Sequence, residues 1–295
     1  MATTGDVVLR QENISAIVTG FALQAYKLKT ICMVESSSSW QESYFKESKA
    51  ELTGGTGSAV KGIPRLAQFP YGEVTWTKVS SYIEKYGLEG VISYEDQKMG
   101  NIGQIARTLL RIGRAVAYAV DNQIARGLFE TSGINTSTIS ATYEWDSLTV
   151  ANRDPVQDIL NGKKELATDN YDPDDGNGYL LVNPTDYANL LGNSKIINNP
   201  TFKSADIVTN GVVGQLLGLK IIVTNSLSTT SSSGVALSGA IVLKAKEAMT
   251  WKEATPLTTL SIEDPGIKTT IRAFELGVLQ VPNPEAICWI KNTKR

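Results

Sequence analysis

The residue types that most often carry chemistry are scarce in this chain of 295 residues. It has no histidine, which is the commonest general base near neutral pH and the commonest metal ligand in proteins. Its two cysteines, Cys32 and Cys288, lie near opposite ends, and neither has a second ligand at metal-binding spacing. We therefore interpret both as free thiols, and we expect no Ser-His or Cys-His nucleophile and no histidine-ligated zinc.

Three short motifs could carry chemistry, and each has a simpler explanation. The run Gly54-Gly-Thr-Gly57 resembles part of a phosphate-binding loop, but it lacks the Gly-Lys-Ser/Thr ending and no helical pattern follows it. Residues 172–178 resemble part of a calcium loop, without the bidentate glutamate that such a loop requires. Glu263 and Asp264 are adjacent, so on a strand they would point to opposite faces. We predict no catalytic residue, no metal site and no cofactor.

The overall composition further limits the kinds of protein that this chain could be. A hydrophobic content of 42% can fill a substantial core, and a net charge of −2 argues against a protein that coats nucleic acid with a strongly basic face. The N-terminus lacks the basic region and apolar core of a signal peptide. No apolar run approaches the roughly 20 residues that a membrane span needs. We expect a protein of an aqueous compartment with no membrane partner.

One long helix is the clearest element that the sequence predicts. Between residues 101 and 130 apolar side chains recur every three or four positions, which is the period of an amphipathic helix. At a rise of 1.5 Å per residue the helix would be roughly 45 Å long. Arg107, Arg111 and Arg114 fall on one of its faces. This basic stripe is either a solvated face or a surface that contacts a partner.

The region before this helix is expected to project from the fold. Residues 14–34 predict a helix or an extended arm. Residues 40–72 have no helical period, contain a glycine-rich stretch and two prolines, and predict a long loop. The aromatic residues between about 40 and 80 are candidates for anchors at a subunit interface, because aromatic side chains in a polar loop favour contact with a partner. These candidates are Trp40, Tyr44, Phe45, Phe69, Tyr71 and Trp76.

The second half predicts a mixture of helices and strands. Asp154-Pro155 is typical of a helix start, with Asp as the cap and Pro in the first turn. Buried strands are predicted at 178–183, 219–224 and 240–245, and alternating strand patterns at 73–95 and 258–290. The stretch 193–211 is expected to be a loop. This order has no regular strand–helix–strand alternation of the kind that indicates a Rossmann or barrel enzyme.

The order and spacing of several segments resemble major capsid proteins of the Hong Kong 97-like fold, shared by tailed phages, related archaeal viruses and encapsulins. The resemblance covers about residues 40–290 and is carried by no catalytic motif. Its segments are the long helix with Asp121 and Ile124-Ala-Arg-Gly127, then Tyr179-Leu-Leu-Val-Asn-Pro, Gln215 to Asn225, Ser238 to Ala248 and Glu275 to Ile287.

The resemblance implies an α+β capsid fold with an N-terminal arm, an extended loop, a long spine helix, a peripheral domain and an axial domain. The arm is expected at 1–38 and the loop at 39–80. The peripheral domain is expected at 81–154 and 256–295, with the spine helix at about 101–130, and the axial domain at 155–255. The protein would then be a structural subunit, not an enzyme.

Two departures from the family concern assembly. Some members link subunits through a Lys–Asn isopeptide bond, but no Asn lies between Asn225 and Asn283 here, and Ile267 stands near the expected position. The shell is therefore expected to be non-covalent. Many members begin with a long helical scaffolding segment. Here only about a hundred residues precede the spine helix, so we expect a separate scaffolding protein or none.

The resemblance also implies partners and a location. The main partner would be the chain itself, in hexamers and pentamers of an icosahedral or prolate shell, with a portal and a decoration protein as further partners. The shell would enclose double-stranded DNA through weak, non-specific contacts, assemble in the host cytoplasm and remain in the virion. The candidates for DNA contact are Arg107, Arg111, Arg114, Lys291, Lys294 and Arg295. The alternatives are an encapsulin-like compartment shell and, from another class, a soluble α/β enzyme.

Overall fold

The computed structural model describes residues 11–46, 62–69, 77–99, 102–197, 214–230, 234 and 236–294. The chain divides into two compact units that interleave along the sequence. The first unit comprises Met1–Glu42, Ser81–Ile124 and Trp251–Gln280, and the second comprises Ser43–Ser80, Ala125–Thr250 and Val281–Arg295.

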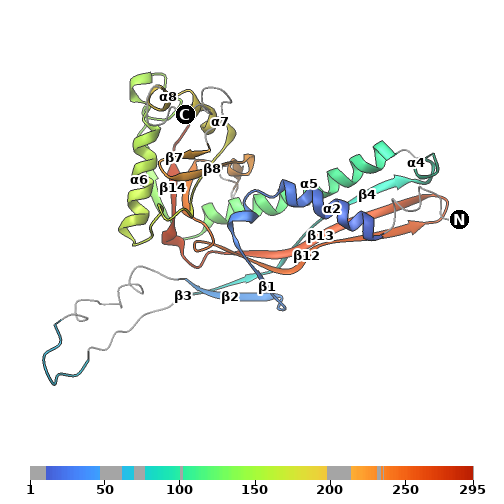
Figure 1. The fold of residues 1–295 in the computed structure, drawn as a ribbon, viewed down its shortest axis with the longest axis horizontal. Coiled ribbons are helices and arrows are strands. Elements are labelled where there is room, and N and C mark those ends of the chain that lie inside the picture. Colours follow the sequence, from blue (N-terminus) through green and yellow to red (C-terminus); the bar gives the residue numbers. More distant parts are fainter. Residues whose placement is uncertain are drawn as a thin grey trace. The chain divides into compact units, whose positions relative to one another are not determined.

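The first unit is built on a four-stranded sheet in the order β1-β12-β13-β4 (Figure 1). Its strands are β1 (Met33–Ser36), β12 (Thr250–Asp264), β13 (Lys268–Gln280) and β4 (Glu84–Ser93). The strands β13 and β4 are antiparallel, with Lys268 opposite Ser93 and Gly277 opposite Glu84. Burial alternates along β13, so one face of the sheet carries apolar residues toward a core.

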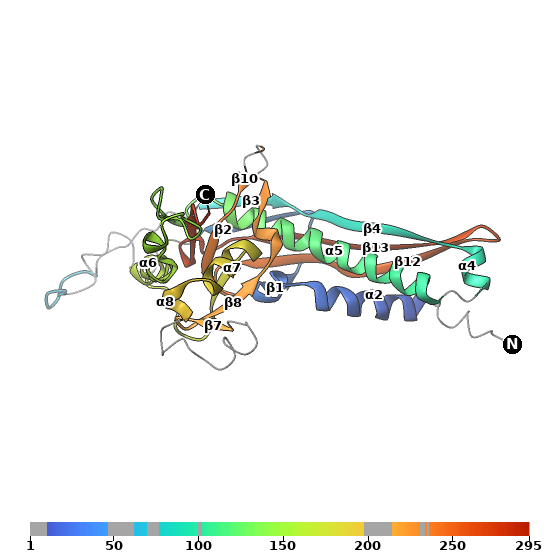
Figure 2. The ribbon, with the colours of Figure 1, turned by 90° about the horizontal axis from the view of Figure 1, so that it is seen from above.

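Two helices cover that apolar face (Figures 1 and 2). They are α2 (Gln11–Ala25) and the long α5 (Ile102–Glu130). Gly113 allows the two helices to approach closely, since a Cβ there would lie 2.9 Å from the carbonyl oxygen of Val18. The buried residues of this core are Ile14, Val18, Ile92, Ile105, Leu109, Ile112, Val116, Ile271 and Ala273.

The second unit contains a six-stranded mixed sheet in the order β5-β14-β11-β6-β8-β7. Pairs β5–β14 and β6–β8 are parallel, and the other neighbours are antiparallel. The central strands β6 and β11 are buried almost throughout, which explains their continuous apolar sequences. The strands are β5 (Asn135–Thr138), β14 (Ile287–Lys291), β11 (Ala240–Lys244), β6 (Gly178–Val182), β8 (Leu219–Val223) and β7 (Gln215–Leu216).

Helix α6 (Pro155–Thr168) packs against β14, β5 and β11 of this sheet. Its Gly162 faces Val242 and Ile290, where a Cβ would lie 3.1 Å from the Val242 side chain. Asp154 caps the helix by accepting the Gln157 N–H at 3.3 Å, and Asn183 caps α7 (Pro184–Leu191) by accepting the Asp186 N–H at 2.7 Å. Both helices carry Pro in their first turn, which the sequence predicted for α6.

Two further pairs of strands are separate from the main sheets. One is β2 (Gln41–Lys46) with β3 (Thr77–Tyr82), and the other is β9 (Thr229–Thr230) with β10 (Ala236–Leu237). The remaining elements are short: η1 (Lys29–Ile31), α4 (Tyr94–Lys98), η2 (Val150–Asn152), α8 (Ser194–Ile197), η3 (Asn225–Leu227) and η4 (Pro284–Ala286).

The strongest sequence patterns predicted these elements well. The helix expected at 101–130 is α5, the helix expected after Asp154 is α6, and the three predicted buried strands are β6, β8 and β11. The α+β class is confirmed. Two predictions were wrong in part. Residues 193–211 were expected to be a loop, yet Ser194–Ile197 form helix α8. Residues 40–72 were also expected to be a loop, yet Gln41–Lys46 form strand β2, which pairs with β3.

The unit boundaries differ from the domain boundaries expected from the resemblance. Residues 125–154 and 281–295 were expected in the peripheral domain, but they belong to the second unit because β5 and β14 pair within its sheet. Residues 251–255 were expected in the axial domain, but they belong to the first unit as part of β12. The described part of the expected arm, 11–38, packs within its own unit.

Candidate functional site

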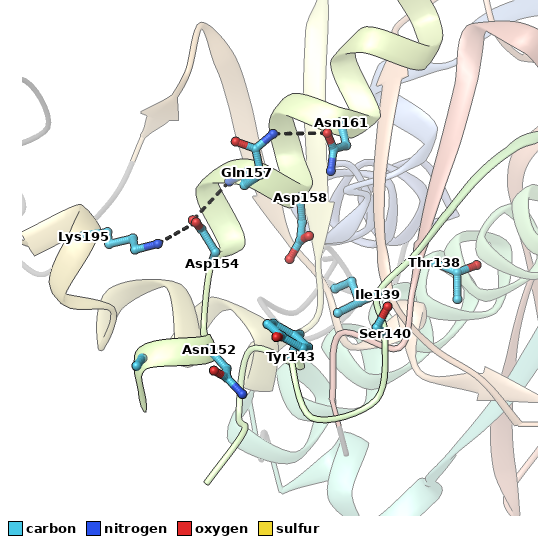
Figure 3. A pocket seen from close by; sticks show the side chains of 11 residues that line it. Thr138, Ile139, Ser140, Tyr143, Asn152, Asp154, Gln157, Asp158, Asn161 and Lys195 are labelled. Carbon is cyan, nitrogen blue, oxygen red and sulfur yellow. Dashed lines mark hydrogen bonds and ion pairs between the residues drawn. The ribbon is translucent and has the colours of Figure 1, made fainter. Parts of the chain in front are cut away.

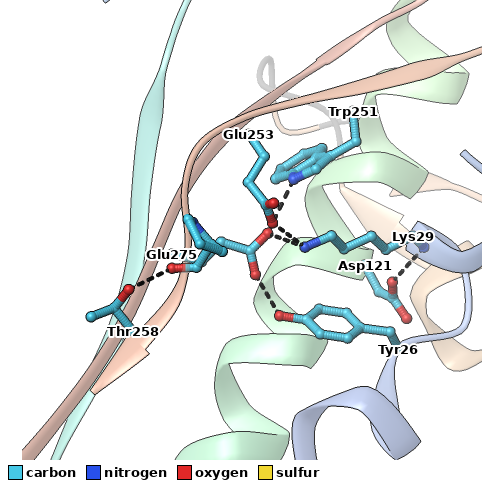
Figure 4. Close-up of polar contacts among 8 residues, drawn as sticks. Tyr26, Lys29, Asp121, Trp251, Glu253, Thr258 and Glu275 are labelled. Atoms are coloured by element: carbon cyan, nitrogen blue, oxygen red, sulfur yellow. Dashed lines mark hydrogen bonds and ion pairs between the residues drawn. The ribbon is translucent and has the colours of Figure 1, made fainter. Parts of the chain in front are cut away.

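A buried carboxylate, Glu275 on β13, is surrounded by hydrogen-bond donors of the first unit (Figure 4). It accepts hydrogen bonds from the Tyr26 hydroxyl, from Lys29 Nζ at 2.6 Å and from Trp251 Nε1 at 3.0 Å. Lys29 Nζ also lies 2.7 Å from Glu253 Oε1. These donors compensate a buried charge that would otherwise cost several kcal/mol. They join the chain that follows α2 to strands β12 and β13.

Asp121 on α5 binds the backbone of the segment that follows α2. It stands on the apolar face of the helix and accepts the backbone N–H groups of Lys27 at 2.7 Å and of Leu28 and Lys29 at 3.1 Å each. Burial raises the pKa of Asp121, although these three hydrogen bonds oppose the shift. Together, Asp121 and Glu275 fix the turn between α2 and β1.

The electrostatics of this network favour a structural role. Burial and the Glu275 carboxylate raise the pKa of Tyr26 well above its usual value, so its hydroxyl stays protonated and donates. Burial lowers the pKa of Lys29, but the hydrogen bonds to Glu253 and Glu275 outweigh it, and the net shift is upward. Lys29 is thus an ammonium ion, which is a donor and not a nucleophile.

A second buried carboxylate, Asp186, lies in the second unit at the start of α7. Asn183 Nδ2 donates to its Oδ2 at 2.8 Å, and the Thr293 hydroxyl donates to the same oxygen at 2.9 Å. Its Oδ1 is buried and accepts no hydrogen bond from the described residues. Burial is the main reason why the pKa of Asp186 rises to about 6. The contact ties the C-terminal residues to α7.

An open pocket of about 440 Å³ lies beside the first turn of α6 (Figure 3). Polar side chains from three parts of the second unit border it, and no sequence argument pointed to it. Asp154 pairs with Lys195 at 2.5 Å, and Asp158 accepts Trp145 Nε1 at 2.9 Å. Its lining residues are Thr138, Ile139, Ser140, Tyr143, Ala151, Asn152, Asp154, Gln157, Asp158, Asn161 and Lys195.

The aromatic residues proposed as interface anchors differ in exposure. Trp40 is 71% exposed, Phe45 52% and Phe69 81%. Tyr44 is half-buried, and burial raises its pKa. Tyr71 and Trp76 lie outside the described residues. The structure therefore leaves Trp40, Phe45 and Phe69 accessible to a partner, whereas Tyr44 is largely engaged within its own unit.

The basic residues proposed for DNA contact fall into two groups. Arg107, Arg111 and Arg114 are exposed on one face of α5, and none of them forms an ion pair with another described residue. At the C-terminus, Lys291 and Lys294 are half-buried, and Lys291 Nζ lies 4.5 Å from the centre of the Trp289 ring. Arg295 lies outside the described residues. Among the described candidates, the arginines of α5 are exposed, whereas the two lysines are half-buried.

The acidic loop before β6 has its carboxylates occupied by neighbours. Lys163 Nζ lies 2.5 Å from Asp174, and Lys244 Nζ lies 3.3 Å from Asp175. No group of three metal-ligating side chains within the described part of the chain could hold a metal ion. Cys32 and Cys288 are free and buried, and burial raises the pKa of Cys288 to about 12. None of the described helices is long and apolar enough to cross a bilayer.

Comparison with known proteins gives the family. A family model described as "Phage capsid protein" matches residues 77–290, which is more than half of the chain. The chain belongs to the phage capsid protein family. The prediction of a phage major capsid protein is thus confirmed. No curated protein sequence matches this capsid protein.

Solved structures confirm the Hong Kong 97-like fold of this capsid protein. The capsid of cyanophage P-SCSP1u is similar with a TM-score of 0.65 and 16% identity, over 88% of this chain and 86% of that chain. The virus-like particle from Pyrococcus furiosus has a TM-score of 0.62 and 15% identity, over 95% and 98%. The mature capsid of bacteriophage PhiM1 has a TM-score of 0.61 and 14% identity, over 90% and 87%.

The aromatic and arginine residues predicted as contact sites remain predictions, although most of the described ones are exposed. The sequence analysis did not find the buried hydrogen-bond networks at Glu275 and Asp186. One signal existed, because Asp121 interrupts the apolar face of the long helix. Nothing local pointed to Tyr26 as a partner of Glu275, since the two are 249 residues apart in sequence.

Proposed function

We propose that this capsid protein is the subunit of an icosahedral or prolate shell that encloses double-stranded DNA and is held together without covalent links. The observation that carries the proposal is the match of residues 77–290 to the phage capsid family. Hexamers and pentamers of the chain would build the shell in the host cytoplasm. A separate scaffolding protein, a portal and a decoration protein are the partners that we propose for assembly.

Two observations support non-covalent cohesion. No Asn lies between Asn225 and Asn283, where cross-linking relatives carry the asparagine that a lysine attacks. In addition, the Glu275 carboxylate is fully buried and already accepts from Tyr26, Lys29 and Trp251. It is therefore a poor base for a lysine arriving from another subunit. Apolar area buried at many repeated interfaces would supply the cohesion instead.

Contact with DNA would be weak and independent of sequence. The exposed and unpaired Arg107, Arg111 and Arg114 are the best candidates for it among the described residues. Purified subunits should bind duplex DNA of any sequence, and binding should fall steeply as salt rises, because phosphate contacts release counterions. Replacing all three arginines by Gln should weaken binding and reduce its salt dependence. Tight binding to one sequence would contradict this part of the proposal.

A second candidate function is a protein compartment that encloses no genome. It is favoured by the similarity to the virus-like particle from Pyrococcus furiosus, which covers 98% of that chain. Particles from infected or induced host cells distinguish the two candidates. After nuclease treatment of the exterior, a virion shell should retain genome-length DNA that is released only by disrupting the particle. Particles that are filled with protein and hold no protected DNA would favour the compartment.

A further inference from the structure

The pocket beside the first turn of α6 combines one aromatic ring with many hydrogen-bonding groups. Its volume of about 440 Å³ lies within the range of small-molecule sites, which is roughly 300–1,000 Å³. Tyr143 supplies the ring and is 52% exposed, so the ring is open to a ligand. Hydroxyl, amide and carboxylate side chains make up most of the remaining lining. This combination suits a ligand that has an apolar face and a polar edge.

The polar side chains of this pocket are held in place and still have hydrogen-bonding capacity. Gln157 Nε2 donates to Asn161 Oδ1 at 3.2 Å, so the Gln157 oxygen can accept and the Asn161 nitrogen can donate (Figure 3). Asp158 Oδ2 accepts from Trp145 Nε1 at 2.9 Å, and no described residue donates to its Oδ1. Trp145 is 1% exposed, so its indole fixes the carboxylate. Donors and acceptors fixed side by side favour a ligand whose own groups do both, as hydroxyl groups do.

The charges of the pocket disfavour the other ligand classes. Asp154 is paired with Lys195 at 2.5 Å, which leaves Asp158 as the one lining carboxylate that forms no ion pair with a described residue, too few for a strong cation site. An anion such as phosphate would meet two carboxylates against a single lysine. An apolar ligand would leave the polar lining unpaired, which is costly. A neutral ligand rich in hydroxyl groups avoids all three penalties, and its hydroxyls form charge-assisted bonds with Asp158.

We propose that this pocket binds a neutral saccharide. The C–H face of one pyranose ring lies on Tyr143, as an amphipathic aromatic side chain allows. The sugar hydroxyls donate to Asp158 and Gln157 and accept from Asn161. Because the pocket is open and its ligand small, we expect a Kd of about 1 mM for a single sugar. All of the lining residues belong to the second unit of one copy, so the site goes beyond the proposed shell function and does not depend on it.

Saturation-transfer NMR on the unassembled full-length chain tests the site. The probes are the methyl glycosides of glucose, galactose, mannose and N-acetylglucosamine, and at least one should bind saturably with a Kd of about 1 mM. Tyr143→Ala should weaken that binding about tenfold, because it removes the stacking ring, whereas Tyr143→Phe should retain it. The matched control is Tyr118→Ala on α5, which removes a tyrosine 51% exposed outside the pocket and should leave binding unchanged.

Asp158→Asn tests the polar side of the pocket and decides the question if Tyr143→Ala does not fold. It keeps an acceptor for Trp145 but removes the charge, so sugar binding should weaken about fivefold. Putrescine and inorganic phosphate are titrated in the same way as charged probes. The proposal is overturned if none of the four sugars binds in the millimolar range, or if binding is unaffected by Tyr143→Ala and Asp158→Asn. Tighter binding of putrescine or phosphate than of every sugar also overturns it. None of these outcomes bears on the shell function, because the subunits are unassembled.

Discussion

At the scale of single residues, Glu275 and Lys29 decide how the N-terminal segment is held. Removing one partner of a buried ion pair usually costs 3–5 kcal/mol, since it leaves the other charge uncompensated. Lys29 keeps Glu253 as a second partner, so Glu275→Gln should lower the free energy of unfolding of the subunit by about 3 kcal/mol. Urea denaturation of unassembled subunits measures this loss.

The matched control is Glu89→Gln, which also breaks an ion pair, with Arg272. Both partners there are substantially exposed, so the loss should stay within about 1 kcal/mol. Equal losses in the two variants would contradict the role assigned to the buried network.

Asp186 makes the stability of the second unit depend on pH. The pKa of Asp186 is about 6 in the folded chain, against 3.8 for an ordinary aspartate. Between these values the folded state binds a proton that the unfolded state does not, so lowering the pH stabilises the fold. Relative to Asp186→Asn, wild-type subunits should therefore gain stability as the pH falls from above 6 toward 4. Parallel pH profiles of the wild type and Asp186→Asn would contradict this raised pKa.

At the scale of elements, the contact between α2 and α5 depends on a missing side chain. A Cβ at Gly113 would lie 2.9 Å from the Val18 carbonyl oxygen, whereas a Cβ at Gly20 in α2 would meet nothing within 4 Å. Gly113→Ala should destabilise the subunit by about 1–2 kcal/mol because the helices must separate. Gly20→Ala should stabilise it by up to about 1 kcal/mol through helix propensity alone. Thermal unfolding of both variants measures the contrast, and two stabilising changes would show that the helices do not pack here.

The helices and strands differ in how well the sequence alone could predict them. The 29 residues of α5 and the apolar runs of β6 and β11 are specified by local patterns, so their prediction succeeded. The assignment of residues 281–291 could not be predicted locally, because β14 joins the second unit by pairing with β5 and β11. The hydrogen bonds that Glu275 accepts could not be predicted locally either, because Tyr26, Lys29 and Trp251 come from distant parts of the chain.

At the scale of the whole molecule, cohesion of the shell is expected to be entirely non-covalent. Cys32 and Cys288 are buried, and the buried Glu275 carboxylate already accepts hydrogen bonds from Tyr26, Lys29 and Trp251. Mature particles boiled in detergent without reductant should therefore release one band near the 31.9 kDa monomer. A ladder of covalent oligomers, or material that does not enter the gel, would contradict the expectation.

The central claim is that copies of this chain build a closed shell. Electron microscopy tests it most directly. The particles would be purified from host cells that produce the chain together with the proposed scaffolding, portal and decoration proteins. We predict closed shells of uniform diameter whose density fits this fold at every subunit position, arranged in pentamers and hexamers. A small oligomer of fixed size, with no shell containing the chain, would contradict the account.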